Sequence, residues 1–192
     1  LSKGTGLSIE GVYRMSMSDE TVKANAMLAG LGRTRRVILG DTLLDDFSRE
    51  ELEVVFAHEV GHHVHRHIRT MILAGLIYSV LGFFLCHQVV SLWTADSQWA
   101  SDAPIAVLAV LMLSVAIFSQ LLEPVQNAIS RHFERQSDRY ALERTLNPEA
   151  YRSAFTKLAV INKADPNPNW LEVFLFHSHP PISERLSVSE NS

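Results

Sequence analysis

Two long hydrophobic runs without formal charge divide this chain. The first covers residues 70–93 and the second residues 103–122, and neither contains Asp, Glu, Lys or Arg. A helix rises about 1.5 Å per residue, so either run is long enough to cross a hydrocarbon core of about 30 Å. We therefore predict two transmembrane helices, with a pair of buried core helices as the alternative.

The charges around these runs predict their orientation. The connector contains Asp96 and Asp102 but neither Lys nor Arg, whereas the outer flanks are rich in arginine, including Arg66, Arg69 and Arg131. By the positive-inside rule, the connector lies outside and both flanks lie in the cytoplasm.

This orientation divides the chain into a cytoplasmic part (1–69), a span (70–93), an external loop (94–102), a second span (103–122) and a second cytoplasmic part (123–192). We expect a multi-pass integral membrane protein with its functional site on the cytoplasmic side. The membrane would be the cell membrane in a prokaryote or the endoplasmic reticulum in a eukaryote.

Polar and apolar positions partly alternate in residues 7–17, which predicts a strand, and residues 35–39 predict a second one. Together they indicate a small sheet or β-hairpin beside the next helix. An exposed edge strand can bind an extended peptide by adding it to the sheet. A purely structural hairpin explains the pattern equally well.

A helix with metal-binding chemistry follows. Ser48, with Glu51 three residues later, predicts a capping box at its start. Helical apolar spacing then continues into His58-Glu59-Val60-Gly61-His62, and nothing obvious interrupts the helix before the first apolar run. Histidines at i and i+4 share a face and can bind one zinc ion, and the glutamate beside them can accept a proton from the attacking water. A surface cluster of histidines is the alternative.

A catalytic zinc needs a third protein ligand and one open position. Glu134 and Asp138 share a helical face. His62 lies eight residues before the first run and Glu134 twelve residues after the second, which corresponds to about 12 and 18 Å along a helix. Antiparallel spans would bring both segments to one side at similar height. Glu134 can therefore complete the site and Asp138 can orient a ligating histidine, although a surface carboxylate pair remains the alternative.

Composition excludes some other classes of function. The net charge is −4 and no basic run is present, so a nucleic-acid partner is not expected. The single cysteine, Cys86, lies inside the first apolar run, which argues against a disulfide framework and against a thiolate nucleophile. Because the chain begins at Leu1, we expect it to be a piece of a longer protein.

Four motifs, in order along nearly the whole chain, resemble the CAAX prenyl endopeptidase family of integral-membrane zinc metalloproteases. The HtpX proteases are similar at greater distance. The motifs are Asn25-Ala26 with residues 36–39 and 41–44, His58-Glu59-x-x-His62 with His67 beyond it, Arg131-x-Phe133-Glu134-x-Gln136-x-Asp138, and Ser178-His179-Pro180-Pro181 with Glu184-Arg185-Leu186.

The resemblance implies a mainly α membrane protein with a zincin-like metalloprotease fold. Its parts would be a juxtamembrane HExxH helix, a small β-hairpin or edge strand and two transmembrane helices. One Zn²⁺ per chain would be held by His58, His62 and Glu134, with Glu59 as the general base and Asp138 behind a ligand.

The resemblance also implies roles in substrate binding and catalysis. His179, held by two prolines, would donate to the developing oxyanion. Arg185 would support that oxyanion or bind a substrate carboxylate, with a surface arginine as the alternative. Asn25 and the strand residues Arg36, Val37 and Ile38 would hold the substrate backbone.

The implied function is zinc-dependent cleavage of membrane-associated polypeptides, prenylated or membrane-inserted ones included, at the lipid bilayer. A membrane protein quality-control protease of the HtpX kind is the first alternative. A non-catalytic zinc-binding membrane protein is disfavoured, because Glu59 has no purpose in a structural zinc site.

Overall fold

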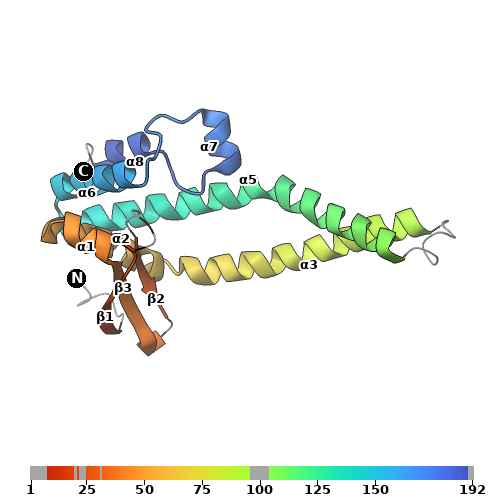
Figure 1. Cartoon of the computed structure of the whole chain (residues 1–192), viewed down its shortest axis with the longest axis horizontal. Helices are drawn as coiled ribbons and strands as arrows, with labels where there is room; N and C mark the ends of the chain where they lie inside the picture. Colours follow the sequence, from red (N-terminus) through yellow and green to blue (C-terminus); the bar gives the residue numbers. More distant parts are fainter. Residues whose placement is uncertain (1–7, 20, 22–24, 31, 96–103, 190–192) are drawn as a thin grey trace.

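Two long helices extend well beyond the rest of the molecule (Figure 1). The computed structural model describes residues 8–19, 21, 25–30, 32–95 and 104–189. The long helices are α3 (His67–Thr94) and α5 (Pro104–Thr145), and both are long and apolar enough to cross a membrane. Only 6% of the apolar window of α3 and 0% of that of α5 is buried. Within the described residues these windows are thus not part of a buried core, which favours the prediction of membrane-crossing helices over the alternative of buried core helices. The predicted external loop at 94–102 lies largely outside the described residues.

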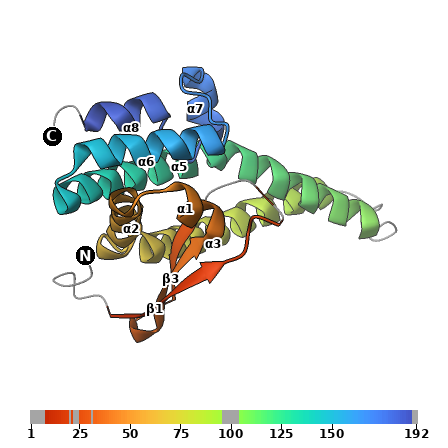
Figure 2. The ribbon, with the colours of Figure 1, turned by 60° about the vertical axis from the view of Figure 1, so that its left-hand side comes forward.

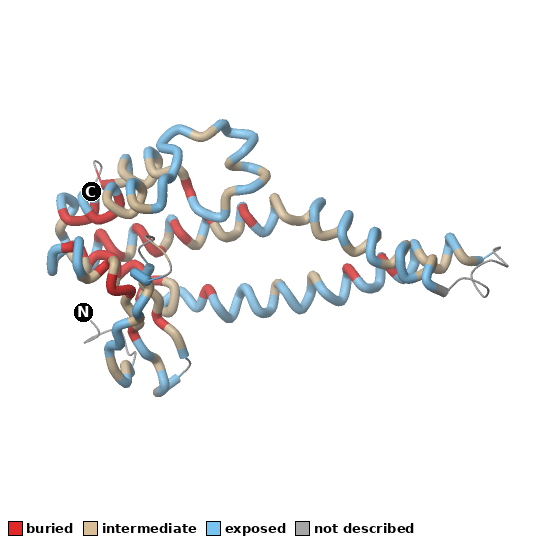
Figure 3. The backbone as a smooth tube through the Cα atoms, viewed as in Figure 1, coloured by how far each residue is buried: buried red, intermediate tan, exposed pale blue. Residues whose placement is uncertain are grey.

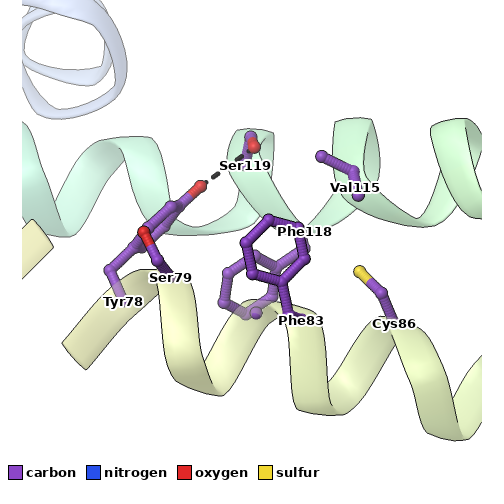
Figure 4. Close-up of a pocket in the computed structure, with 8 residues that line it drawn as sticks. Tyr78, Ser79, Phe83, Cys86, Val115, Phe118 and Ser119 are labelled. Atoms are coloured by element: carbon purple, nitrogen blue, oxygen red, sulfur yellow. Dashed lines mark hydrogen bonds between the residues drawn. The ribbon is translucent and has the colours of Figure 1, made fainter. Parts of the chain in front are cut away.

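α3 and α5 pack against one another through a small contact in their apolar parts (Figure 4). The Tyr78 hydroxyl donates to Ser119 Oγ at 2.9 Å. A methyl group on Gly82 would lie 2.5 Å from a ring carbon of Phe118, so only glycine admits this ring. Cys86 is buried beside the same contact.

A three-stranded sheet lies against one side of the helical end. Its strands are β1 (Ile9–Met15), β2 (Ala26–Ala29) and β3 (Arg35–Gly40), in the order β1-β3-β2, and a 3₁₀ turn η1 (Gly32–Thr34) precedes β3. β3 is parallel to β1 and antiparallel to β2. Only β2 and β3 form a hairpin, and the short β2 (AMLA) carries no β-branched residue that would have signalled it in the sequence.

The middle position of β3 contradicts one prediction. Arg36, Val37 and Ile38 are paired with β1 on one side and with β2 on the other. Their backbone groups are therefore already used, and this strand is not an exposed edge that could receive a substrate strand.

A buried carboxylate fastens the end of β1 to the following helix α1 (Asp41–Asp46). Asp41 accepts hydrogen bonds from the backbone N–H groups of Met17, Ser18 and Thr42 and from the Ser18 hydroxyl, at 2.8–3.1 Å. These donors, the Met17 N–H first, lower the pKa of Asp41 to about 2 although burial opposes the charge.

The next helix, α2 (Arg49–Val64), begins as predicted but ends earlier than predicted. Ser48 and Glu51 form the expected capping box. The helix stops at Val64, and α3 starts after a turn in which Arg66 adopts a left-handed conformation with φ of 60°. The prediction of an uninterrupted helix is therefore wrong. The sequence did not reveal this break, because neither glycine nor proline marks it. A left-handed residue other than glycine costs roughly 1–2 kcal/mol.

α5 continues without a break from its apolar part, past Pro124, to Thr145. α6 (Pro148–Ile161), α7 (Trp170–Phe176) and α8 (Ile182–Val188) follow. Figure 2 shows the sheet on one side of α2, with α6 and α8 on the other. The buried residues gather where α2, α5 and α6 meet (Figure 3), and the core there is built from Val54, Leu142, Tyr151 and Phe155.

Candidate metal centre

α2 and α5 bring three potential metal ligands to one point. Nε2 of His58 lies 3.2 Å from Nε2 of His62, since the two residues are one turn apart on α2. Glu134 of α5 completes the group, with Oε2 at 3.4 Å from His58 Nε2 and Oε1 at 3.3 Å from His62 Nε2. His58, His62 and Glu134 are thus together, as expected from the sequence.

These distances fit a tetrahedral zinc ion. Ligand atoms about 2.0–2.2 Å from a tetrahedral zinc are separated from one another by about 3.3–3.5 Å. The two imidazole nitrogens are 3.2 Å apart, and each faces a different oxygen of Glu134 at 3.4 and 3.3 Å. With one ligand atom taken from each residue, the three atoms lie within 4.8 Å of one another, which is compact enough for one zinc ion. Two imidazoles and one carboxylate are also the ligand set of many catalytic zinc sites, which keep a fourth position open.

The close approach of the two helices depends on Gly61. A methyl group at this position would lie 3.0 Å from Cα of Ser137 on α5. Glycine therefore lets α2 and α5 approach at the level of the ligands, between His58 and His62.

Asp138 lies behind His58. Its Oδ1 is 2.9 Å from Nδ1 of His58, and both side chains are buried. Burial by itself lowers the pKa of His58, but Asp138 and Glu134 outweigh it and raise this pKa to about 9. In the neutral ring, the contact with Asp138 favours the proton on Nδ1 and leaves Nε2 as the atom that can bind a metal.

Glu59 follows His58 on α2 and is half-buried. Burial raises the pKa of its carboxyl group, and the neighbouring His58 and His62 offset part of this rise. A carboxylate with a raised pKa is a stronger base, which suits a group that must accept a proton near neutral pH.

Arg185 of α8 lies beneath the ligands and is not a surface residue. Its Nε and Nη2 donate to the two oxygens of Asp138 at 2.9 and 2.6 Å, and its Nη2 is 3.6 Å from Glu134. The guanidinium stacks on Phe155 of α6 at 4.0 Å. With 12% of the side chain exposed, Arg185 holds the carboxylates in place, and the alternative of a surface arginine is wrong.

His179 lies at the exposed side of the cluster. Its Nδ1 is 3.0 Å from Oε2 of Glu134, and 65% of the side chain is exposed. Arg131 of α5 fixes the preceding segment, because its Nη1 donates to the carbonyl oxygens of Val173 and His177 at 2.8 and 2.6 Å. His179 can thus reach a molecule that enters from solvent.

The predicted substrate-binding residues lie on the sheet, apart from the ligand cluster. Arg36 makes two hydrogen bonds of 3.0 Å to Glu10. Val37 is buried against Val60 of α2, and Ile38 lies beside it on β3. Asn25 is exposed at the start of β2.

Comparison with known proteins identifies the family. The model of peptidase family M48 matches residues 1–191. The chain belongs to peptidase family M48. Members of this family are zinc-dependent metalloproteases.

Curated relatives of this chain include several proteases. An uncharacterized metalloprotease of Bacillus subtilis, YhfN, is 31% identical and is matched over 99% of this chain and 46% of its own length. CAAX prenyl protease 1 of Saccharomyces cerevisiae is 27% identical over 98% of this chain and 45% of its own length. A protease HtpX homolog of Ligilactobacillus salivarius is 29% identical over 87% of this chain and 63% of its own length.

The fold of this chain is similar to that in a crystal structure of Ste24p from S. mikatae. The two structures agree with a TM-score of 0.84 at 23% identity, over 98% of this chain and 48% of the Ste24p chain. This agreement shows the fold alone. The chain spans about half the length of the curated relatives that it matches first.

Sequence reasoning missed some residues that surround the candidate ligands. Tyr151 of α6 is fully buried among Asp138 and Arg185, and burial raises its pKa. Phe155 carries the Arg185 guanidinium. Both lie on the apolar face of α6. Helical periodicity predicts that they are in the core, but it does not predict their contacts with Asp138 and Arg185. His67 and Gln136 lie behind His62. The sequence analysis included both in the motifs but gave neither a role.

Proposed function

We propose that this protein is a membrane-embedded zinc endopeptidase that cleaves membrane-associated polypeptides in the manner of the CAAX prenyl proteases. The observation that carries this proposal is the convergence of His58, His62 and Glu134 at separations that suit zinc. Glu59 beside the cluster supports catalysis over a structural role, since a structural zinc site needs no base.

In this proposal His58, His62 and Glu134 hold one Zn²⁺ per chain. Bound zinc supplies Lewis acidity, which polarises the scissile carbonyl and lowers the pKa of water. The carboxylate of Glu59 accepts the proton of the attacking water and delivers it to the leaving amine. Asp138 keeps the proton of His58 on Nδ1, and Arg185 neutralises the carboxylates beneath the ligands.

His179 is our candidate for the donor to the developing oxyanion. Its exposure and its contact with Glu134 place the ring beside the ligands, where a substrate carbonyl oxygen can approach. Among the substrate-binding candidates Asn25 remains, because it precedes β2, a strand at the edge of the sheet. The active site would face the cytoplasm, with α3 and α5 crossing the bilayer and the connector outside.

A second candidate is membrane protein quality control of the HtpX kind. The HtpX homolog of L. salivarius matches this chain at an identity of 29%, close to that of the yeast CAAX prenyl protease 1. Both candidates use the same chemistry and differ in substrate.

Zinc content and peptide cleavage, measured on the same preparations, test the proposal. Glu134→Ala should lose its zinc. Glu59→Gln should keep one zinc per chain and cleave about 10²–10⁴-fold more slowly than the parent. Cleavage at the parental rate by Glu59→Gln would exclude this residue as the base.

Paired substrates then separate the two candidates. A farnesylated peptide and its unmodified twin should be cleaved at different rates by a CAAX-type enzyme. A quality-control protease should instead prefer an unfolded membrane protein and treat the two peptides alike.

A further inference from the structure

The turn between α2 and α3 brings a fourth histidine to the ligand cluster. In a straight helix His67 would lie about 140° around and about 7.5 Å along the axis from His62, too far for contact. The left-handed Arg66, with φ of 60°, ends α2 and redirects the chain. As a result Nδ1 of His67 comes to 3.0 Å from Nδ1 of His62.

The other ring nitrogen of His67 is held by α5. Its Nε2 lies 2.8 Å from Oε1 of Gln136. The ring stacks on Phe133, with 4.2 Å between centroids and 11° between planes, and His67 is 3% exposed. A buried, stacked ring with a partner at each nitrogen has one orientation.

The positions of the ring protons of His62 and His67 follow from which atoms can donate and which can only accept. An amide oxygen only accepts, so His67 carries its proton on Nε2 and has a lone pair on Nδ1. The two facing Nδ1 atoms share one proton, which must then come from His62. Nε2 of His62 is left with its lone pair, directed at His58 Nε2 and Glu134.

The reverse assignment does not support a metal ligand. If the Gln136 amide donated to His67, the proton between the Nδ1 atoms would belong to His67. Neutral His62 would then carry its own proton on Nε2, the atom that approaches the other ligands.

We propose that His67 and Gln136 are positioning residues that hold His62 in the tautomer whose Nε2 binds the metal, as Asp138 does for His58. This inference rests on the proposed function, because it requires His62 to be a zinc ligand. The left-handed turn at Arg66 is the backbone feature that makes the contact possible. Loss of such supporting groups typically weakens metal binding about 10- to 100-fold.

Zinc dissociation constants of the full protein in detergent, measured by competition with a chromogenic chelator, test the proposal. His67→Leu keeps an apolar side chain against Phe133 but removes the acceptor, and should bind zinc about 10- to 100-fold more weakly. His67→Asn can place an amide oxygen near the former Nδ1 and should recover most of the affinity.

The second partner gives an independent pair of variants. Gln136→Met, of similar size but without the acceptor oxygen, should weaken zinc binding, and Gln136→Glu should not. His132→Gln is the matched control, because this exposed histidine lies one turn before Gln136 on α5 and should bind zinc as the parent does.

Nitrogen-15 shifts of the histidine rings in the zinc-loaded parent give a readout that does not depend on affinity. They should show the proton of His67 on Nε2 and that of His62 on Nδ1. Thermal unfolding in excess chelator checks that each variant is folded.

Two results would overturn the inference: parental zinc affinity in both His67→Leu and Gln136→Met, or a proton on Nδ1 of His67. A parent protein that binds no zinc would instead refute the proposed function, so the two failures are distinguishable.

Discussion

Replacing Gly61 by alanine tests how closely α2 and α5 must approach for the ligands to meet. The added methyl group would lie 3.0 Å from Cα of Ser137 and 3.2 Å from its Cβ. Non-bonded carbon atoms prefer about 3.5–4.0 Å, so the helices would have to separate locally by a few tenths of an ångström. The nearest atom belongs to the backbone, and no side-chain rotation relieves the contact.

A separation of this size is comparable to the tolerance of a metal site. Glu134 is 3.4 Å from His58 and 3.3 Å from His62, and metal–ligand distances vary by only about 0.2 Å. We expect zinc to bind about 10- to 100-fold more weakly. Overpacking costs about 1–3 kcal/mol and the better helix propensity of alanine returns about 1 kcal/mol. The free energy of unfolding should therefore fall by no more than about 2 kcal/mol.

Chelator competition and thermal unfolding in excess chelator measure the two effects separately. Gly75→Ala is the control, since an added methyl group there meets nothing within 4 Å. It should gain helix propensity and leave zinc affinity unchanged. If Gly61→Ala binds zinc as tightly as the parent, the close approach of α2 and α5 is not what assembles the site.

Three further predictions concern stability, catalysis and orientation. The pKa of Asp41 is about 2 in the folded protein and about 3.9 in an unfolded chain, so its contribution to stability is present above about pH 4 and is lost towards pH 2. Asp41→Asn should therefore be less stable than the parent at pH 6, and the difference in unfolding free energy should shrink as the pH falls; a constant difference would contradict this linkage. His179→Ala should keep its zinc and turn over about 10²–10³-fold more slowly, and Arg131→Met, which frees the preceding segment, should lose up to about 10²-fold through misplacement; parental kcat in both variants would remove this segment from the mechanism. On a cysteine-free background, a cysteine at Ser97 but not one at Ser189 should react with an impermeant outside reagent, and the opposite pattern would reverse the orientation.

Residue spacing predicted the assembly of the ligands well. The i, i+4 rule placed His58 beside His62, and comparing distances from the apolar runs brought Glu134 to the same height. Both arguments use only the helical rise and the adjacency of the two spans. Neither argument needs to know how the side chains of the two helices pack.

The turn at Arg66 and the strand order of the sheet could not be predicted from the sequence, because no characteristic residue marks either of them. Arg66 adopts a left-handed conformation although arginine is not a residue that usually does so. The parallel pairing of β1 with β3 depends on which strands become neighbours, and the alternation of polar and apolar positions within one strand does not reveal this. Both errors affected the predicted function. The uninterrupted helix hid the contact of His67 with His62, and the missed strand order led us to predict β3 as an edge strand that binds substrate.

Between the candidate ligands and each apolar run, the backbone has one position that departs from a regular helix. On the α3 side, the left-handed turn at Arg66 separates the helix that carries His58 and His62 from the first apolar run. On the α5 side, Pro124 lies between the second run and Glu134; it has no N–H for the carbonyl of Gln120, and helices bend most easily at such positions. A bilayer of different thickness changes the tilt of the helices that span it. If α3 and α5 span a bilayer as proposed, Pro124 lets the apolar part of α5 bend relative to Glu134. A tilt of α3 would instead be transmitted to the ligands, because His67 at its first position contacts His62.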